Sequence, residues 1–167
     1  MADWSLREKL QPSLLDRLTD DEPSKQVEST SSQIINERQF KEAVIRDLAW
    51  LLNTVALDVT EDLEAYPEVA HSVLNYGMPD LTGQVAYSID VRALEKTVRE
   101  AIVAYEPRVL DDHLRVKLHL DRAAMSHNAL SFDIRGAVFG QPVPFQVILR
   151  SKLDLESGEF QVTEASR

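Results

Sequence analysis

The segment that most constrains this chain is Tyr105-Glu106-Pro107-Arg108-Val109, where the spacing of apolar residues changes from helical to extended. Pro107 lacks an N–H, and its ring moves Glu106 out of the helical region, so a helix ends here. We therefore expect a helix that either Ser88 or Asp90 caps and that ends before Pro107, followed directly by strands. The residues before this stop recur at intervals of three and four, as on one stripe of a helix: Val91, Leu94, Val98, Ala101, Ile102 and Tyr105.

The charged pair on either side of Pro107 has two interpretations. On an extended backbone, Glu106 and Arg108 project to the same side. The pair is either a local ion pair at the helix exit, or a pair that Pro107 fixes and offers to a partner chain. We expect Pro107 to fix the turn and Arg108 to reach outward. Whether the two side chains face each other or a partner stays open at this point.

A second helix is expected earlier in the chain. A capping-box pattern begins at Asn36, and the apolar stripe that follows predicts a helix over 36–57, with Val55 on the stripe. Glu42 and Arg46 are four residues apart and are expected to form an exposed pair on its surface.

The part of the chain after Arg108 alternates apolar and polar residues, which is typical of strands. Gly136 interrupts the second of these strands and marks a possible bulge. Because the connections are short, we expect an α+β fold: N-terminal helices packed on one face of a three- to four-stranded antiparallel sheet. The other face is either solvated or a docking surface for acidic groups, since it carries Arg115, Lys117, Arg135, Arg150 and Lys152.

The short last strand, Phe160 to Thr163, is expected at an edge of the sheet. Edge strands present free N–H and C=O groups, and few charges blunt this one. Strand addition by a partner is therefore a candidate function of this segment. We name Phe160 and Val162 as partner-binding candidates.

Residues 1–33 are predicted to form an arm that precedes one domain over 34–167. Residues 12–18 suggest a short helix that is too short to be stable alone. Residues 19–33 are polar and predict a flexible linker. The apolar face of the short helix either covers the core of its own domain or docks on another protein; we name its residues as partner-binding candidates, namely Leu14, Leu15 and Leu18.

Composition excludes several classes of function. The net charge of −10 argues against general nucleic-acid binding. The chain has no cysteine, which excludes disulfides and cysteine-ligated zinc and fits a reducing cytoplasm. It has no apolar run near 18 residues, so direct membrane insertion is not expected. The first residues do not resemble a secretory signal.

No catalytic constellation stands out in the sequence. Glu106 is the best single candidate for an acid catalyst, but no second carboxylate pairs with it in a recognisable way. His113 and His119 are too far apart along one strand to share a metal easily. The five glycines form no phosphate-binding loop. We expect no enzyme, no cofactor and no metal.

Several segments together resemble TssE, the small baseplate subunit of type VI secretion systems, which is similar to the small wedge protein of contractile phage baseplates. The resemblance extends from about residue 13 to the end of the chain; it rests on motifs up to Val109 and mainly on strand layout afterwards. Its segments are Ser13-Leu14-Leu15-Asp16-Arg17-Leu18, Arg46 to Thr54, Ser72 to Leu81 with Asn75-Tyr76-Gly77-Met78-Pro79-Asp80-Leu81, and Tyr105 to Val109. One departure is Val55, where family members commonly carry a basic residue.

The resemblance implies a structural protein in a cytoplasmic baseplate docked at the inner membrane. Its partners would be the larger wedge subunits of the TssF and TssG type, and the first ring of the contractile sheath. The family's Glu-Pro-Arg motif maps onto Glu106, Pro107 and Arg108 and implies contacts to the wedge core bundle. The sheath contact resembles strand exchange.

Two other functions remain as alternatives. Some relatives have been labelled lysozymes, which keeps a peptidoglycan hydrolase in view. A bacterial anti-adaptor shares the fold, so a free-standing cytoplasmic adaptor is the third reading, because a fold does not determine a partner.

Overall fold

The computed structural model describes residues 10, 12–19, 23–24, 35–119, 128–139 and 144–165, apart from the side chain of Tyr87. Its helices are α1 (Leu14–Leu18), α2 (Glu37–Leu52), α3 (Pro67–Ala70) and α4 (Val91–Tyr105), with short 3-10 turns η2 (Leu57–Val59), η3 (Val73–Asn75) and η4 (Ala86–Ser88). Its strands are β1 (Val109–His119), β2 (Ala129–Val138), β3 (Phe145–Asp154) and β4 (Phe160–Glu164).

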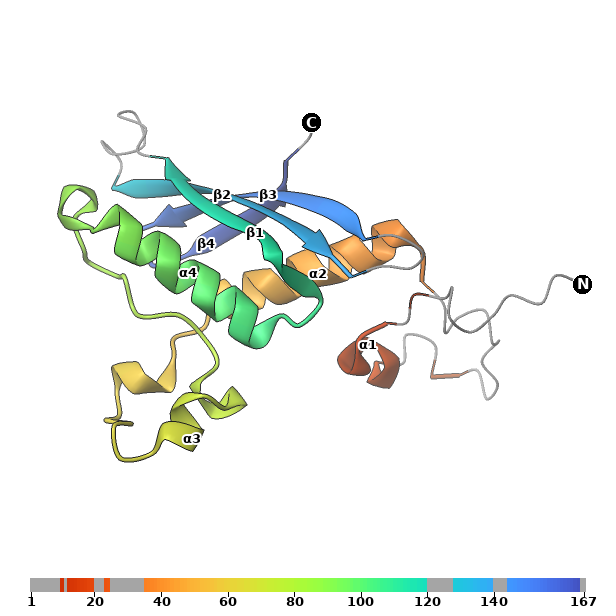
Figure 1. The fold of residues 1–167 in the computed structure, drawn as a ribbon, viewed down its shortest axis with the longest axis horizontal. Helices are drawn as coiled ribbons and strands as arrows, with labels where there is room; N and C mark the ends of the chain where they lie inside the picture. The colour runs from red at the N-terminus through yellow and green to blue at the C-terminus, as the bar shows by residue number, and fades with distance from the viewer. Residues whose placement is uncertain are drawn as a thin grey trace, which may run out of the picture.

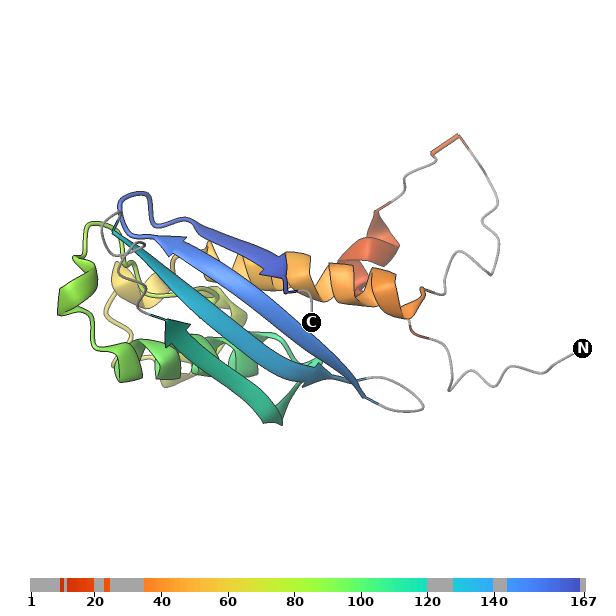
Figure 2. The same cartoon turned by 90° about the horizontal axis from the view of Figure 1, so that it is seen from above.

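The four strands form one antiparallel sheet in the order β1-β2-β3-β4. Helices α2 and α4 lie under the same face of this sheet, with α4 against β1 and α2 against β4 (Figure 1). Figure 2 shows the sheet from above with the helices behind it. The expected α+β fold is confirmed, with four strands.

Local sequence signals explain where the two long helices begin. The side chain of Asn36 accepts a hydrogen bond from the backbone N–H of Gln39, and the side chain of Gln39 accepts one from the backbone N–H of Asn36, which completes the capping box of α2. Asp90 caps α4 by accepting from two backbone N–H groups. The apolar stripes of both helices meet the inner face of the sheet in one core, in which Val44, Val98, Ile102, Leu130 and Phe132 are fully buried.

Helix α2 is shorter than the sequence predicts, because it ends at Leu52 instead of continuing to residue 57. The Asn53 side chain donates to the carbonyl of Ala49 at 2.7 Å, and the Thr54 hydroxyl donates to the carbonyl of Trp50 at 2.7 Å. The Thr54 N–H donates to the Leu51 carbonyl at 3.4 Å, and its hydroxyl satisfies the Trp50 carbonyl that a continuing helix would use. Val55 is therefore not on the apolar stripe; it is 54% exposed and forms a parallel bridge with Met78.

The expected bulge lies on the strand opposite Gly136. Strand β2 pairs with β3 without interruption through Gly136. The register shifts instead in β1, between Leu110 and Arg115. A Cβ atom at Gly136 would lie 3.4 Å from Val109 and 3.6 Å from Leu114, so the glycine leaves room for the irregular part of β1.

Most of residues 1–33 lie outside the described residues, so the division into an arm and a domain stays a prediction. The predicted linker over 19–33 falls almost wholly outside them. None of the helices in the described ranges is long and apolar enough to cross a membrane.

Candidate functional site

The Glu106 and Arg108 side chains face each other and form a two-pronged ion pair. Arg108 donates from Nε to Glu106 Oε1 at 2.7 Å and from Nη2 to Oε2 at 2.5 Å. The backbone N–H of Arg108 also donates to Oε1, at 3.2 Å. Pro107 makes this possible, because it places one residue at the end of α4 and the other at the start of β1. Such planar, paired hydrogen bonds are the strongest geometry for an arginine and a carboxylate.

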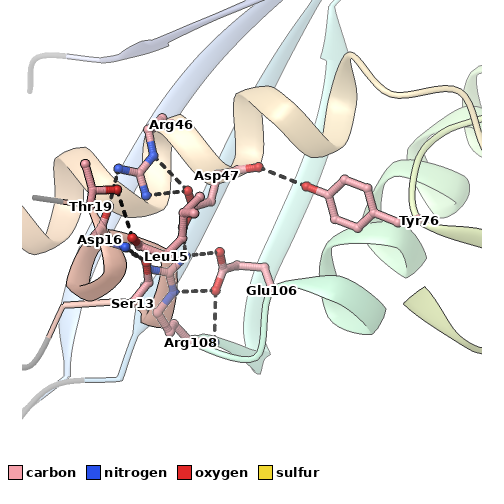
Figure 3. Close-up of polar contacts among 9 residues, drawn as sticks. All are labelled: Ser13, Leu15, Asp16, Thr19, Arg46, Asp47, Tyr76, Glu106 and Arg108. Carbon is pink, nitrogen blue, oxygen red and sulfur yellow. Dashed lines mark hydrogen bonds and ion pairs between the residues drawn. The ribbon is translucent and has the colours of Figure 1, made fainter. Parts of the chain in front are cut away.

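This ion pair is one end of a chain of charged groups that joins α4, α2 and α1. Arg108 Nη2 also donates to Asp47 Oδ2 at 2.5 Å. Asp47 Oδ1 accepts from Arg46 at 2.7 and 2.9 Å, and Arg46 donates to Asp16 of α1 at 2.5 Å. We call these five residues the charged chain. Figure 3 shows it running from Asp16 of α1 across α2 to Glu106 and Arg108.

The charged chain is partly withdrawn from water. Glu106 is 4% exposed, and the side chain of Arg108 is 21% exposed. Burial lowers the pKa of Arg108, but hydrogen bonds and charge from Glu106 and Asp47 outweigh it and raise the pKa above the ordinary arginine value. The hydrogen bond from Arg46 lowers the pKa of Asp16, against a smaller opposing effect of burial. Both pKa shifts favour the ionised forms of Arg108 and Asp16.

Two sequence predictions about this region are wrong. Arg108 does not reach outward, because Glu106 and Asp47 hold its guanidinium. Arg46 does not pair with Glu42; it pairs with Asp16 and Asp47, while Glu42 pairs with Arg38. The local ion pair is what the isolated chain contains. A role of Glu106, Pro107 and Arg108 in binding a partner stays a prediction.

The leucines of α1 do not join the core. Ser13 caps this helix, and Leu14, Leu15 and Leu18 are 70%, 52% and 73% exposed. Asp16 ties the helix to α2 through its pair with Arg46. Of the two readings left open by the sequence, a cover for the domain's own core does not fit these exposures.

Strand β4 lies at an edge of the sheet, as expected. The ring of Phe160 is buried in the core, 5.8 Å from the ring of Phe132, so this candidate offers a partner only its backbone. Asn53 already occupies that backbone: its side chain accepts from Phe160 N–H and donates to Phe160 C=O, each at 2.9 Å. The two groups therefore point away from β3. Because backbone direction alternates along a strand, those of Val162 and Glu164 also point outward.

The acid candidate Glu106 is held in an ion pair in the described structure. Both oxygens of Glu106 are engaged by Arg108. No group of three or more His, Asp or Glu residues in the described part of the chain could hold a metal ion. His119 pairs with Asp133 at 3.2 Å on the outer face of the sheet. Arg150 also lies against Asp133 at 3.2 Å, so this cluster is a set of surface ion pairs.

Sequence reasoning missed Asp47 and Asn53. Asp47 lies three residues after Val44 and four before Leu51, both fully buried, so it is a charge on the apolar stripe of α2. A charge at such a position needs a partner, which is a usable signal. Asn53 gave no comparable signal, because its contact with Phe160 spans 107 positions of the chain.

Comparison with known proteins identifies a family. A family model described as "Baseplate wedge protein gp25" matches residues 38–143, which is more than half of the chain. No curated protein and no solved structure matches the chain significantly. The matched range includes α2, the Asn75-to-Leu81 segment, the turn at Pro107 and the first two strands. The resemblance to baseplate wedge proteins is therefore confirmed: this chain belongs to the gp25 family of baseplate wedge proteins.

Proposed function

We propose that this chain is the small wedge subunit of a type VI secretion baseplate, a TssE-type protein. In this role it joins the core bundle of the larger TssF- and TssG-type subunits to the first ring of the contractile sheath and helps to initiate sheath assembly. It works in the cytoplasm, in a baseplate docked at the inner membrane, and has no catalytic role. Membership of the wedge family supports the structural role.

The open edge of β4 is the observation that supports the proposed contact with the sheath. Asn53 satisfies the outward backbone groups of Phe160, whereas no side chain in the described residues forms a hydrogen bond with those of Val162. A groove of about 620 Å³ lies beside this end of the sheet, lined by Glu37, Lys41, Phe145, Gln146, Ile148, Glu164 and Ala165. Free backbone groups beside an open groove suit an added strand from a sheath subunit.

We assign the contact with the core bundle to a second surface, around α1. There, the exposed leucines of α1 lie next to the charged chain, because Asp16 is part of α1 and is also a member of the charged chain. Apolar side chains beside ordered charges are typical of a subunit interface. We assign Leu14, Leu15 and Leu18 to direct contact with the larger subunits. Glu106, Pro107 and Arg108 hold the adjoining surface in shape and meet the bundle at its rim.

Val162→Pro tests the sheath contact. Proline removes an N–H that faces away from β3, so the ladder to β3 stays intact, as edge strands tolerate. Val162→Ala is the matched control, since it shortens the same side chain and keeps the N–H. We expect Val162→Pro to fold and to join purified wedges but to fail to start sheath polymerisation on them, whereas Val162→Ala starts it normally. Normal polymerisation with a folded Val162→Pro protein would refute strand addition at β4.

A further inference from the structure

Residues 57–75 form a projecting segment that we call the acidic lobe. It contains η2, α3 and η3, and it extends from the helix side of the molecule, away from the sheet (Figure 1). None of the contacts described above for the sheath or the core bundle involves it. Its surface therefore needs a separate explanation.

The acidic lobe exposes an unusual share of large apolar side chains. Val73 is 80% exposed, the highest value among the large apolar residues of the described chain, and Leu74 beside it is 68% exposed. Tyr66 and Val59 add to the same lobe at 62% and 43%. Single exposed apolar residues are ordinary on a protein surface, but the adjacent pair Val73 and Leu74, with two more in the same short segment, favours a binding surface.

The body of the protein holds this apolar group rigidly. Tyr105 of α4 donates from its hydroxyl to the carbonyl of Asn75 at 2.8 Å. The buried Asn75 side chain accepts from Asp58 N–H at 2.9 Å and donates to Ala70 C=O at 3.1 Å, which ties η2, α3 and η3 together. The Tyr76 ring packs edge-on against Tyr105 at 5.3 Å. Rigid presentation lowers the entropy lost on binding, which favours a docking role over a loose loop.

Charge indicates what kind of partner the lobe fits. Between Arg46 and Arg92 the chain has no lysine or arginine. The lobe carries five carboxylates, all exposed and none ion-paired within the described residues: Asp58, Glu61, Asp62, Glu64 and Glu68. Such a field repels nucleic acid and anionic membrane and attracts a basic protein segment.

A groove at the base of the lobe matches a cationic side chain. It has a volume of about 320 Å³ and lies between the lobe and α4, with Asp58 on one wall and Glu100 on the other. His71, Asn75 and Tyr105 also line it. A lysine or arginine placed there would lie between two carboxylates, a favourable environment for its charge.

We propose that the acidic lobe is a docking surface for a basic segment of another protein, whose apolar anchors pack on Val73 and Leu74 while a lysine or arginine enters the groove beside Asp58. That the partner is another wedge subunit rests on the proposed function. A second copy of this chain is the competing occupant, because the outer face of its sheet carries basic residues such as Arg115 and Arg150.

The test measures binding of the full chain to a wedge complex purified without it. Val73→Ser/Leu74→Ser removes the apolar anchors at two exposed positions, so the variant should melt like the wild type. Val85→Ser is the matched control, since Val85 is 45% exposed and lies outside the lobe. We expect the dissociation constant of the double variant to rise by about tenfold or more, as for central interface residues, and that of the control to stay unchanged. Glu61→Lys/Asp62→Lys should weaken binding as well, and should reduce its dependence on salt.

A photo-reactive p-benzoylphenylalanine at position 73 identifies the occupant. We expect it to cross-link, in the assembled wedge, to a peptide of another subunit in which lysine or arginine flanks apolar residues. A cross-link to a second copy of this chain, or to an acidic peptide, would overturn the proposal, as would unchanged binding by a folded Val73→Ser/Leu74→Ser protein. Failure of the wild type to bind the wedge would instead refute the proposed function itself.

Discussion

Replacing Arg108 by alanine should destabilise the isolated domain strongly. The change removes the only cation that contacts Glu106 in the described chain, and Glu106 is 4% exposed. Breaking a buried pair by removing one partner costs about 3–5 kcal/mol, because the other charge stays buried without compensation. The Arg108 side chain is 21% exposed, so the cost should fall near the lower end, about 3 kcal/mol.

The measurement is urea unfolding of the isolated protein, followed by circular dichroism, with thermal melting beside it. A loss of about 3 kcal/mol corresponds to a fall in Tm of roughly 6–12 °C for a domain of this size. Glu106→Gln/Arg108→Ala should recover part of the loss, because the neutral amide no longer carries a buried charge. The cycle formed by the two single variants and the double variant isolates the coupling between the side chains.

Arg38→Ala is the matched control for this experiment. Arg38 also pairs with a glutamate on α2, at 2.9 Å, but its side chain is 86% exposed. Its loss should leave the denaturation midpoint unchanged, since exposed pairs contribute little. A loss of less than about 1 kcal/mol for Arg108→Ala would refute the reasoning, because it would mean that water compensates Glu106 in the folded state.

Three further substitutions test other parts of the described structure. Asn53→Ala should leave the Phe160 N–H without its side-chain acceptor, so hydrogen exchange at Phe160 should become much faster while the core strands stay protected. An unchanged exchange rate would refute the role of Asn53 in protecting this edge of the sheet. Leu14→Ser/Leu18→Ser should change the free energy of unfolding by less than about 0.5 kcal/mol, because both side chains are exposed, and should weaken binding to the wedge. A large loss of stability would show instead that these leucines belong to the core. Gly77→Ala should lower the free energy of unfolding, measured by urea titration, by more than about 1 kcal/mol, because φ is +141° and the new Cβ would lie 2.5 Å from the Thr54 carbonyl oxygen. An unchanged free energy of unfolding would show that the backbone shifts freely there.

The periodic elements could be predicted from the sequence because local rules determine them. Helix α4 begins at its Asp90 cap and ends before Pro107, and both signals are local. The end of α2 was misplaced because Val55 continues the apolar pattern, whereas the deciding contacts are side-chain hydrogen bonds from Asn53 and Thr54. Apolar spacing cannot register such contacts.

Residues distant in sequence decide the charged chain. From the sequence, Arg46 and Glu42 satisfied a helical pairing rule, and only folding shows that Asp16 lies close enough to compete. Arg108 was expected to reach outward, but Asp47 on α2 lies 61 positions earlier and draws it inward. The helix end before Pro107 was thus predicted, while the orientation of Arg108 depended on a residue that the Glu-Pro-Arg motif does not contain.

Side chains block the two edges of the sheet to different extents. An added strand therefore has one edge on which it can pair, and a fixed point on that edge where the pairing must end. On β1, Glu95 accepts from the Leu118 N–H at 2.9 Å, and Arg115 donates to the Leu114 carbonyl at 2.9 Å, so side chains occupy groups that an added strand would need. On β4, Asn53 occupies only Phe160.

An added strand can therefore pair along β4 from Val162 onward. The pairing must stop before Phe160, because the Asn53 amide occupies the backbone groups with which the next residue of the added strand would pair. Removing this amide should let the pairing extend toward Phe160, so Asn53→Ala should bind an added strand over a longer stretch and with less certain register. Protection of the Phe160 amide by the joined strand in Asn53→Ala wedges would be the sign of that extension, and its absence would mean that something other than Asn53 limits the pairing.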